Sequence, residues 1–469
     1  MKIAFVHHHF RPGGVTRVIT DQITSLRDQV ETLLIIGEPP SHQISFPFVV
    51  VPSLAYDRDR GVSISPVDIA RSILNSVTAI WEGGADLYHF HNPTLGKNAD
   101  LISAVKALIS MKENILLQVH DFAEDGRPGG YSREEYPADC HYAVINRRDY
   151  SLLMRSGIKT SGLHYIPNAI RPLKPAGSEH RQKDIVLYPI RAIRRKNIGE
   201  AILLSLFLNT NEKVGITLEP TGALDMKSYT DWRNFVINEN LSVAFRLGIE
   251  NDFFTVLSRT RYMITTSIKE GFGFSFLEPW TANKMLFGRL LKDICSDFMN
   301  KGIKLDHLYE SVKIPLTFID RQLLHIKWTT CYREKLNQYG IFDTSNKVEE
   351  YFNLLTENGY IDFGILSEDL QKQVILNILK SKSKYNKILD LNPGFKNISL
   401  SKESRGMIES NKKIIKDEYS PERNRSILLD VYRKVLSVAV TQSIDKRVLL
   451  DTFNTPEKNF LLLCDSAYG

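Results

Sequence analysis

The sequence is poor in cysteine and has no long apolar run. Its 469 residues include four cysteines, which are far apart and form no C-x-x-C motif: Cys140, Cys295, Cys331 and Cys464. This pattern argues against a zinc site or a disulfide framework and favours a reducing compartment. No stretch approaches the ~20 apolar residues of a membrane-spanning helix, and the apolar run that begins at Met1 is too short for a signal peptide. We therefore expect a cytoplasmic protein.

A strong excess of charge is also missing. The formal net charge is +6 and the isoelectric point is near 8.8. Such a mild excess fits a polyphosphate ligand or an anionic membrane surface, but it is too weak to indicate nucleic acid as a partner. Hydrophobic residues make up 43% of the chain, which is ordinary for a globular protein of two or three domains.

Short apolar runs alternate with amphipathic stretches along the chain. The alternation predicts an α/β fold with parallel sheets. Ligands of such sheets bind at the carboxyl ends of strands, so the polar residues just after each run are the first candidates for a site. Helix-like stretches include residues 18–26, 67–81 and 98–111. Runs expected to form buried strands cover residues 2–7, 32–36, 48–51, 87–90, 115–119, 142–145, 164–166, 184–189 and 262–266.

The most informative strand end follows the last of these runs. Gly271 and Gly273 let the chain turn there without Cβ clashes, and residues 274–280 have the pattern of a helix start. A strand, a glycine turn and a helix start present unpaired backbone N–H groups to an anion or a sugar hydroxyl. Glu270 and Glu278 stand at the two ends of the turn, where carboxylates suit the hydroxyls of a sugar or a ribose. A plain strand-to-helix turn with two surface glutamates is the alternative interpretation.

A second glycine turn follows the amino-terminal run. Gly13 and Gly14 lie between that run and a helical stretch, which predicts a βα unit with a phosphate-sized nest. The turn is not G-x-G-x-x-G, so it fits a simple dinucleotide-binding fingerprint poorly. His7, His8 and His9 come just before it, but neighbours on a strand point to alternate faces and cannot all converge. We therefore expect no metal site there.

The segment from Glu270 to Glu278 resembles the E-x7-E signature, EGFGxxxxE, of retaining GT-B glycosyltransferases. That large family, of the family-four type, includes sucrose synthases, bacterial mannosyltransferases and relatives of glycogen synthase. The resemblance implies that Glu270 contacts the transferred sugar and that Glu278 holds the ribose of the nucleotide. It also implies that the amides of the turn approach the sugar hydroxyls, the turn residues being Gly271, Phe272, Gly273 and Phe274.

Two strand ends in the first part of the chain match the same family. The segment that contains Gly13 and Gly14 resembles the family's PGGxxR opening, in which the glycine amides approach the donor phosphate and the acceptor. His120 stands in the place of a strand-end histidine that reaches the donor sugar. His89 and His91 match an H-x-H of the family and are weaker candidates. For all three, a histidine that only satisfies its structural neighbours is the alternative.

The phosphate-binding residues are expected after the strand at 184–189. Arg191 and Lys196 keep the spacing of the family's GRLxxxKG segment, which grips the diphosphate. Arg can fork two phosphate oxygens and Lys adds a point charge, whereas a solvated run of charges is the alternative. Asn197 stands where the family has glycine. Leu247 and Gly248, at the end of a further expected strand, resemble the segment whose backbone reads the base.

The resemblance implies a GT-B fold, in which two Rossmann-like domains face each other across a cleft, with an extended helical C-terminal region. We expect an N-terminal acceptor-side domain at 1–172 and a C-terminal domain at 182–425 that binds the nucleotide sugar. A linker rich in proline and charge joins them at 171–181, and a helical elaboration at about 293–411 extends the second domain. Residues 426–469 are a helical segment of the kind that crosses back to the first domain in the family.

The predicted function is retaining hexosyl transfer from a nucleotide-diphosphate sugar to an acceptor hydroxyl. No metal or other cofactor is expected, and the acceptor is a small molecule, a glycan or a lipid. A nucleotide-sugar epimerase of the same architecture and a non-catalytic nucleotide-sugar-binding protein are the alternatives. The mild basic charge is compatible with peripheral membrane contact. Asp57 and Asp59 spell a D-x-D motif, which binds metal in another glycosyltransferase fold, but their polar surroundings indicate a solvated loop.

Overall fold

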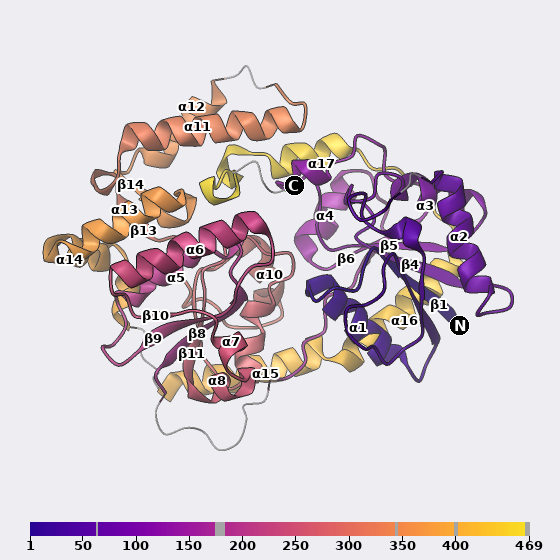
Figure 1. Cartoon of the computed structure of the whole chain (residues 1–469), viewed down its shortest axis with the longest axis horizontal. Coiled ribbons are helices and arrows are strands. Elements are labelled where there is room, and N and C mark those ends of the chain that lie inside the picture. Colours follow the sequence, from indigo (N-terminus) through magenta and orange to yellow (C-terminus); the bar gives the residue numbers. More distant parts are fainter. Residues whose placement is uncertain (62–63, 174–182, 343–345, 398–401, 465–469) are drawn as a thin grey trace. The chain divides into compact units, whose positions relative to one another are not determined.

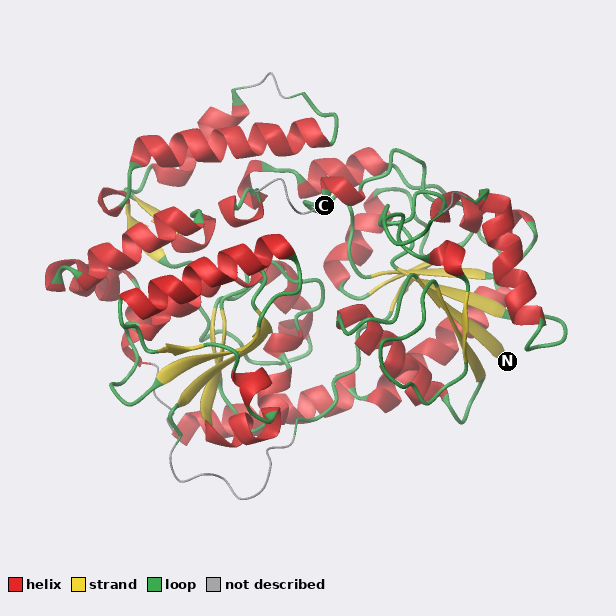
Figure 2. Cartoon of the chain, viewed as in Figure 1, coloured by secondary structure: helices red, strands yellow, loops and turns green. Residues whose placement is uncertain are grey.

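The structure is a computed structural model that describes residues 1–61, 64–173, 183–342, 346–397 and 402–464 (Figure 1). The expected linker at 171–181 lies largely outside these residues. The chain divides into two compact units. Unit 1 comprises Met1–Ala169 and Asp417–Asn454, and unit 2 comprises Ile170–Lys416 and the described residues after Asn454. Figure 2 shows that each unit contains a sheet surrounded by helices.

Unit 1 contains a seven-stranded parallel sheet with the order β3-β2-β1-β4-β5-β6-β7. These strands coincide with the expected apolar runs to within one residue at either end, because most of the runs are buried in a parallel sheet, the edge strand β3 being the most exposed. The strands are β1 (Lys2–His7), β2 (Glu31–Ile36), β3 (Phe48–Val50), β4 (Leu87–His91), β5 (Ile115–Val119), β6 (His141–Val144) and β7 (Leu163–Tyr165).

Helices cover both faces of this sheet. Ala4 and Val6 of β1 belong to the core under α2 and α3, whereas Ile3 and Phe5 belong to the core under α1 and α16. This alternation follows from the two-residue period of a strand. The helices of unit 1 are α1 (Gly14–Leu26), η1 (Pro52–Leu54), α2 (Pro66–Thr78), α3 (Leu101–Ser110), η2 (Pro128–Gly130), α4 (Arg147–Arg155), α16 (Pro421–Ser437) and α17 (Lys446–Phe453).

Unit 2 contains a five-stranded parallel sheet with the order β10-β9-β8-β11-β12. The two parallel sheets confirm the predicted α/β class. The strands are β8 (Ile185–Arg191), β9 (Lys213–Leu218), β10 (Val243–Ala244), β11 (Thr260–Thr265) and β12 (Leu286–Gly288). The helices around them are η3 (Arg194–Lys196), α5 (Ile198–Ser205), α6 (Ala223–Asn238), α7 (Leu247–Glu250), α8 (Phe253–Arg259), η4 (Phe274–Phe276), α9 (Glu278–Thr281) and α10 (Lys292–Asn300).

The region after α10 is mostly helical, as the sequence predicts, but it also contains an antiparallel strand pair that was not expected. Trp328 and Val374 belong to the same hydrophobic core as Val186 of β8, so this region extends the core of unit 2. Its elements are β13 (Lys313–Pro315), η5 (Leu316–Phe318), α11 (Arg321–Gln338), α12 (Lys347–Thr356), β14 (Tyr360–Asp362), η6 (Phe363–Ile365), α13 (Glu368–Leu379), α14 (Lys382–Leu391), η7 (Pro393–Asn397), α15 (Lys402–Tyr419), η8 (Pro456–Lys458) and η9 (Leu461–Leu463).

Two of the four cysteines are paired, which corrects the expectation from their spacing. Cys331 in α11 forms a disulfide with Cys464, although 133 positions separate them in the sequence, and their Cα atoms lie 5.6 Å apart. The sequence could not reveal this pair, because only the fold brings the two segments together. In the fold, η9, just before Cys464, packs near α11. Cys140 and Cys295 are buried thiols.

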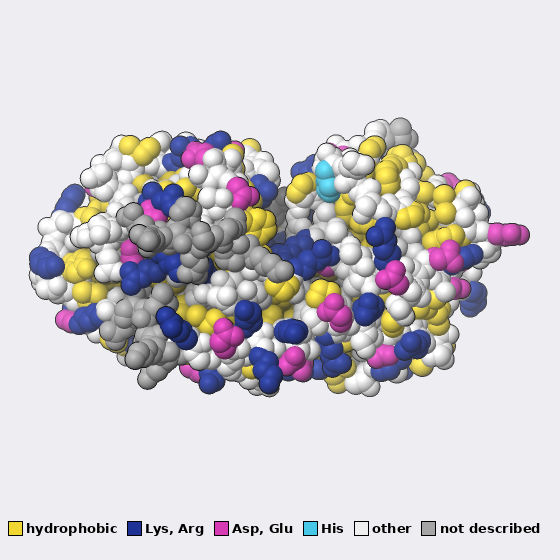
Figure 3. All heavy atoms as spheres, turned by 90° about the horizontal axis from the view of Figure 1, so that it is seen from below, with side chains coloured by type: hydrophobic (Ala, Val, Ile, Leu, Met, Phe, Trp, Pro, Cys, Tyr) yellow, Lys and Arg dark blue, Asp and Glu magenta, His cyan; other side chains and the backbone are white. Residues whose placement is uncertain are grey.

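The surface carries charges of both signs. On the face in Figure 3, Lys and Arg side chains are interspersed with Asp and Glu side chains, as expected for a small net charge. Within the described residues, no helix is both long enough and apolar enough to cross a bilayer. The same residues contain no group of three or more His, Cys, Asp or Glu side chains that could hold a metal ion.

Candidate active site

Two loops at the same edge of the unit 2 sheet are tied together by hydrogen bonds. β8 and β11 are parallel neighbours, so the loops after them leave the sheet side by side. The hydroxyl of Tyr188 donates to the carbonyl oxygen of Lys196 at 2.7 Å, and the hydroxyl of Thr266 donates to the same carbonyl at 3.1 Å. The amide of Ile268 donates to the carbonyl of Arg195 at 3.0 Å. These bonds hold η3 against the loop that leads to Glu270.

Lys196 and Glu270 form an ion pair where the two loops meet. The Lys196 Nζ lies 2.5 Å from Glu270 Oε1, and Arg195 Nη1 lies 3.8 Å from the other carboxylate oxygen. Burial alone would raise the pKa of Glu270, but the two cations outweigh it and hold the pKa of this carboxyl below its ordinary value. Glu270 therefore stays ionised and can accept hydrogen bonds from hydroxyl groups, although only 8% of the residue is exposed.

Asn197 performs the backbone task of the glycine that it replaces. Its φ of 48° and ψ of 57° lie in the left-handed region, which glycine adopts freely and asparagine tolerates better than most residues. The side chain is used as well: Nδ2 donates to Glu200 Oε2 at 2.8 Å, and Oδ1 accepts from Gln371 Nε2 at 3.0 Å. The departure from glycine therefore preserves the turn after Lys196 and attaches it to α5 and α13.

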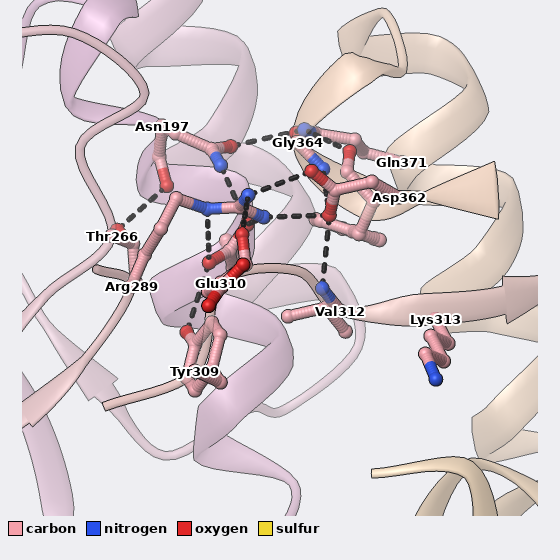
Figure 4. A network of polar contacts seen from close by, with 12 residues as sticks. Asn197, Thr266, Arg289, Tyr309, Glu310, Val312, Lys313, Asp362, Gly364 and Gln371 are labelled. Atoms are coloured by element: carbon pink, nitrogen blue, oxygen red, sulfur yellow. Dashed lines mark hydrogen bonds and ion pairs between the residues drawn. The ribbon is translucent and has the colours of Figure 1, made fainter. Parts of the chain in front are cut away.

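A buried network around Arg289 reaches Asp362 of the helical extension (Figure 4). Arg289, just after β12, donates to both carboxylate oxygens of Glu200 at 3.0 and 2.5 Å and to both oxygens of Asp362 at 2.7 and 2.8 Å. The hydroxyl of Tyr309 donates to Glu200 Oε1 at 2.9 Å. Through this network and Gln371, the extension supports the turn that carries Lys196.

The glycine turn after Glu270 has the tight geometry that its sequence indicates. Gly273 has a φ of 93°, and a Cβ there would lie 2.8 Å from the ring of Phe276 and 3.2 Å from Ile294. Phe272 is buried and packs edge-on against Phe298. The turn is followed by the single-turn helix η4 and the four-residue helix α9, so the helix start expected over 274–280 is present but the helical segment is short.

Glu278 begins α9 and lies near the Lys196–Glu270 pair. Burial lowers the pKa of Lys196 overall, and the negative charges of Glu270 and, to a smaller extent, Glu278 oppose this lowering. Both glutamates of the signature thus influence Lys196: Glu270 forms an ion pair with it, and Glu278 affects its pKa through its negative charge. This arrangement brings three of the residues that the sequence singled out into one group.

Arg191 ends β8, and its side chain reaches the end of the neighbouring strand β9, on the side of β8 away from β11. The expected base-reading segment lies next to β9 as well. The Arg191 Nη1 donates to the carbonyl oxygen of Glu219, after the neighbouring strand β9, at 3.0 Å. Leu247 and Gly248 begin helix α7 and do not end a strand, because β10 stops at Ala244. A Cβ on Gly248 would lie 3.2 Å from the Thr217 side chain, so glycine allows α7 to pack closely on β9.

His120 follows β5 in unit 1 and belongs to a buried group of histidines. Its Nε2 lies 2.9 Å from His91 Nδ1, and its backbone N–H donates to Asn92 Oδ1 at 2.6 Å. Burial lowers the pKa of His120 to about 4, so the ring is neutral near pH 7. His89 pairs with the hydroxyl of Tyr432 at 3.0 Å, and burial lowers its pKa to about 3. The hydrogen bonds of His89 and His91 favour the structural alternative for these two.

Gly13 and Gly14 are exposed at the start of α1. A Cβ on Gly14 would have no heavy atom within 4 Å, so the backbone is accessible there.

The D-x-D motif forms a turn held by arginines: Asp57 pairs with Arg60 at 2.5 Å and Asp59 with Arg11 at 3.0 Å. These ion pairs agree with the loop interpretation of the motif.

Several residues of the site could not be selected from the sequence. Tyr188 and Thr266 act through their contacts with the carbonyl of Lys196, and Ser267 lies 3.0 Å from the Tyr188 hydroxyl. The sequence offered one weak signal: Tyr188 interrupts the apolar run of β8, and the hydroxyl residues Thr266 and Ser267 follow β11. Arg289 and Glu200 gave no signal because they belong to no motif and are 89 positions apart.

Comparison with known proteins identifies the fold and one related enzyme. No protein-family model matches the chain. Over 430 residues the chain is 27% identical to the mannosylglucosyl-3-phosphoglycerate synthase of Petrotoga mobilis, with 82% of each protein covered. Among solved structures it resembles HepE of Anabaena in complex with UDP and glucose, with a TM-score of 0.54 and 11% identity over 92% of this chain and 99% of that chain. Sucrose-phosphate synthase from Thermosynechococcus elongatus gives a TM-score of 0.54 and 12% identity over 93% and 99%. These two structures establish the GT-B fold.

Proposed function

We propose that the chain, which has the GT-B fold, is a nucleotide-sugar-dependent glycosyltransferase that transfers a hexosyl group to a hydroxyl of a glycosylated phosphoglycerate. The observation that carries the donor half of this proposal is the ion pair between Lys196 and Glu270 at the carboxyl edge of the unit 2 sheet. It combines a cation for a departing diphosphate with a carboxylate for sugar hydroxyls in one place. The acceptor half is supported by the name of the related synthase.

On the donor side, we assign the diphosphate to Lys196 and Arg191. As the bond between the sugar and the diphosphate breaks, negative charge grows on the leaving oxygens, and a nearby ammonium stabilises that charge. Glu270 and the amides from Gly271 to Phe274 hold the transferred sugar, and Glu278 holds the ribose. Leu247 and Gly248 contact the base through their backbone. The residues present can neutralise the leaving group without a metal ion.

On the acceptor side, we assign the neutral ring of His120 to the donor sugar and the exposed backbone of Gly13 and Gly14 to the donor phosphate and the incoming acceptor. The related synthase is named for a product in which mannose is joined to glucosyl-3-phosphoglycerate. We therefore propose a nucleotide-diphosphate mannose as donor and glucosyl-3-phosphoglycerate as acceptor. The configuration at the transferred carbon is retained.

A panel of nucleotide-diphosphate sugars tests the function directly. With glucosyl-3-phosphoglycerate as acceptor, we expect one mannose donor to give a disaccharide product with the anomeric configuration of the donor, which NMR coupling constants report. The reaction should continue in EDTA. Conversion of the donor into its sugar epimer without an acceptor would establish the epimerase instead, and binding without turnover of any donor would establish the non-catalytic alternative.

Glu278 provides a separate test of the ribose assignment. Glu278→Ala should raise the KM for the donor about tenfold to a hundredfold, because a hydrogen bond to a charged group contributes roughly 1.5–3 kcal/mol. A donor with 2′,3′-dideoxyribose should bind the wild type as weakly as it binds the variant, since the interaction is then already missing. Glu409→Ala, at an exposed position of α15, serves as the matched control. Equal losses on ribose and dideoxyribose donors would show that Glu278 acts elsewhere.

A further inference from the structure

Four cations lie after strands at the carboxyl edge of the unit 1 sheet and have no part in the donor chemistry. Arg11 follows β1, Arg58 follows β3, Lys97 follows β4 and Arg127 follows β5. We call these four residues the cation cluster. They come from four loops that are distant in sequence, but parallel strands bring their carboxyl ends to one edge.

The loops of the cation cluster are joined by backbone hydrogen bonds. The amide of Asp57 donates to the carbonyl of Lys97 at 2.8 Å, and the amide of Gly96 donates to the carbonyl of Gly130 at 2.7 Å. The amide of Ala99 also donates to the Asp57 carboxylate at 3.0 Å. The backbones of the loops that carry Arg58, Lys97 and Arg127 are thus joined by hydrogen bonds. This favours a preformed binding site over a set of independent surface charges.

The arginines of the cluster have carboxylate partners. Arg11 pairs with Glu38 at 2.5 Å and with Asp59 at 3.0 Å. Arg58 lies 3.6 Å from Asp59, and Arg127 lies 2.9 Å from Asp121.

Lys97 differs from these arginines, because no carboxylate among the described residues forms an ion pair with it. Its side chain is only partly exposed. Burial lowers the pKa of Lys97, and the nearby Arg127 and Arg58 lower it further. The ammonium of Lys97 is therefore partly desolvated and is repelled by two positive charges. An anionic ligand would offset both the desolvation and the repulsion.

We propose that Lys97, flanked by Arg58 and Arg127, binds the phosphate or carboxylate of the acceptor. The inference rests on the proposed function, because it assigns the anionic end of the glycosylated phosphoglycerate to unit 1. Arg58 also lies over the ring of Tyr56, with its guanidinium carbon 5.4 Å from the ring centre, which restricts its position. The cation cluster would therefore distinguish an anionic acceptor from a neutral sugar.

The test compares Lys97→Gln with Lys159→Gln, which removes the charge of an exposed lysine of the same unit that is not part of the cation cluster. Calorimetry with 3-phosphoglycerate measures the anion site alone, and the KM for glucosyl-3-phosphoglycerate measures it during turnover. We expect Lys97→Gln to weaken both by about tenfold to a hundredfold, as for the loss of a charged hydrogen bond. Lys159→Gln should behave as wild type, and Lys97→Arg should recover most of the affinity.

The outcomes separate this inference from the proposed function. If wild type and Lys97→Gln bind 3-phosphoglycerate equally, or if neither binds it, the anion site is wrong even where glycosyl transfer is observed. If binding depends on Lys97 but no donor is turned over, the anion site stands and the proposed function fails. If Lys97→Gln raises the donor KM and leaves the acceptor KM unchanged, the cluster serves the donor diphosphate and the acceptor assignment is overturned.

Discussion

Replacing Lys196 with alanine is expected to lower kcat by a factor of about 100 to 1000. That is the usual loss when one group that stabilises charge in the transition state is removed from a water-poor site. The ammonium of Lys196 is well placed for this role because only 14% of its side chain is exposed and its backbone carbonyl is held by the hydroxyls of Tyr188 and Thr266. The measurement is steady-state kinetics with a saturating nucleotide sugar and acceptor.

The control must separate chemistry from folding, because Lys196→Ala also leaves Glu270 buried without its closest cation. Lys227→Ala makes the same substitution at an exposed position of α6 and should leave kcat unchanged. Thermal unfolding of Lys196→Ala shows how much of its loss comes from stability. A well-folded Lys196→Ala protein with a kcat within threefold of wild type would show that the leaving diphosphate is neutralised by other groups.

Most strands of unit 1, together with β8 and β11, were predictable because they are apolar runs that a parallel sheet buries. β1 and β5 have the bounds that the sequence predicts, and the loops after strands hold candidate site residues such as Gly13, His120 and Glu270. The turn between Glu270 and Glu278 was also foreseeable, since Gly273 adopts a conformation that side-chain-bearing residues rarely accept. These features depend on local chemistry that a short stretch of sequence displays.

Features that depend on tertiary packing were beyond the sequence. The helix start at residues 274–280 was foreseeable, but its short length was not: α9 has four residues, and Asn283 then takes a left-handed φ of 56°. The disulfide between Cys331 and Cys464 joins segments that no local pattern connects. The same limit hid the support of Lys196 by the helical extension, because its members are single polar residues scattered among apolar ones.

Arg289→Met is expected to lower the free energy of unfolding of unit 2 by about 3–5 kcal/mol. Arg289 is 3% exposed and Glu200 is fully buried, so losing the guanidinium leaves the buried carboxylate of Glu200 and the partly buried one of Asp362 without their cation. The cost of an uncompensated buried charge exceeds the small net contribution of the intact pair. Chemical denaturation followed by tryptophan fluorescence measures it, since Trp232 and Trp328 both lie in this core.

A matched substitution at an exposed ion pair gives the comparison. Arg333 of α11 pairs with Glu349 at 3.1 Å, and both side chains are about half exposed, at 50% and 39%. Arg333→Met should change stability by less than about 1 kcal/mol, because water screens such pairs. If the two variants were equally stable, the Arg289 network would not hold the extension to the sheet. A large loss at Arg289 together with a reduced kcat in the surviving folded protein would instead tie this network to the turn at Asn197, and through that turn to Lys196.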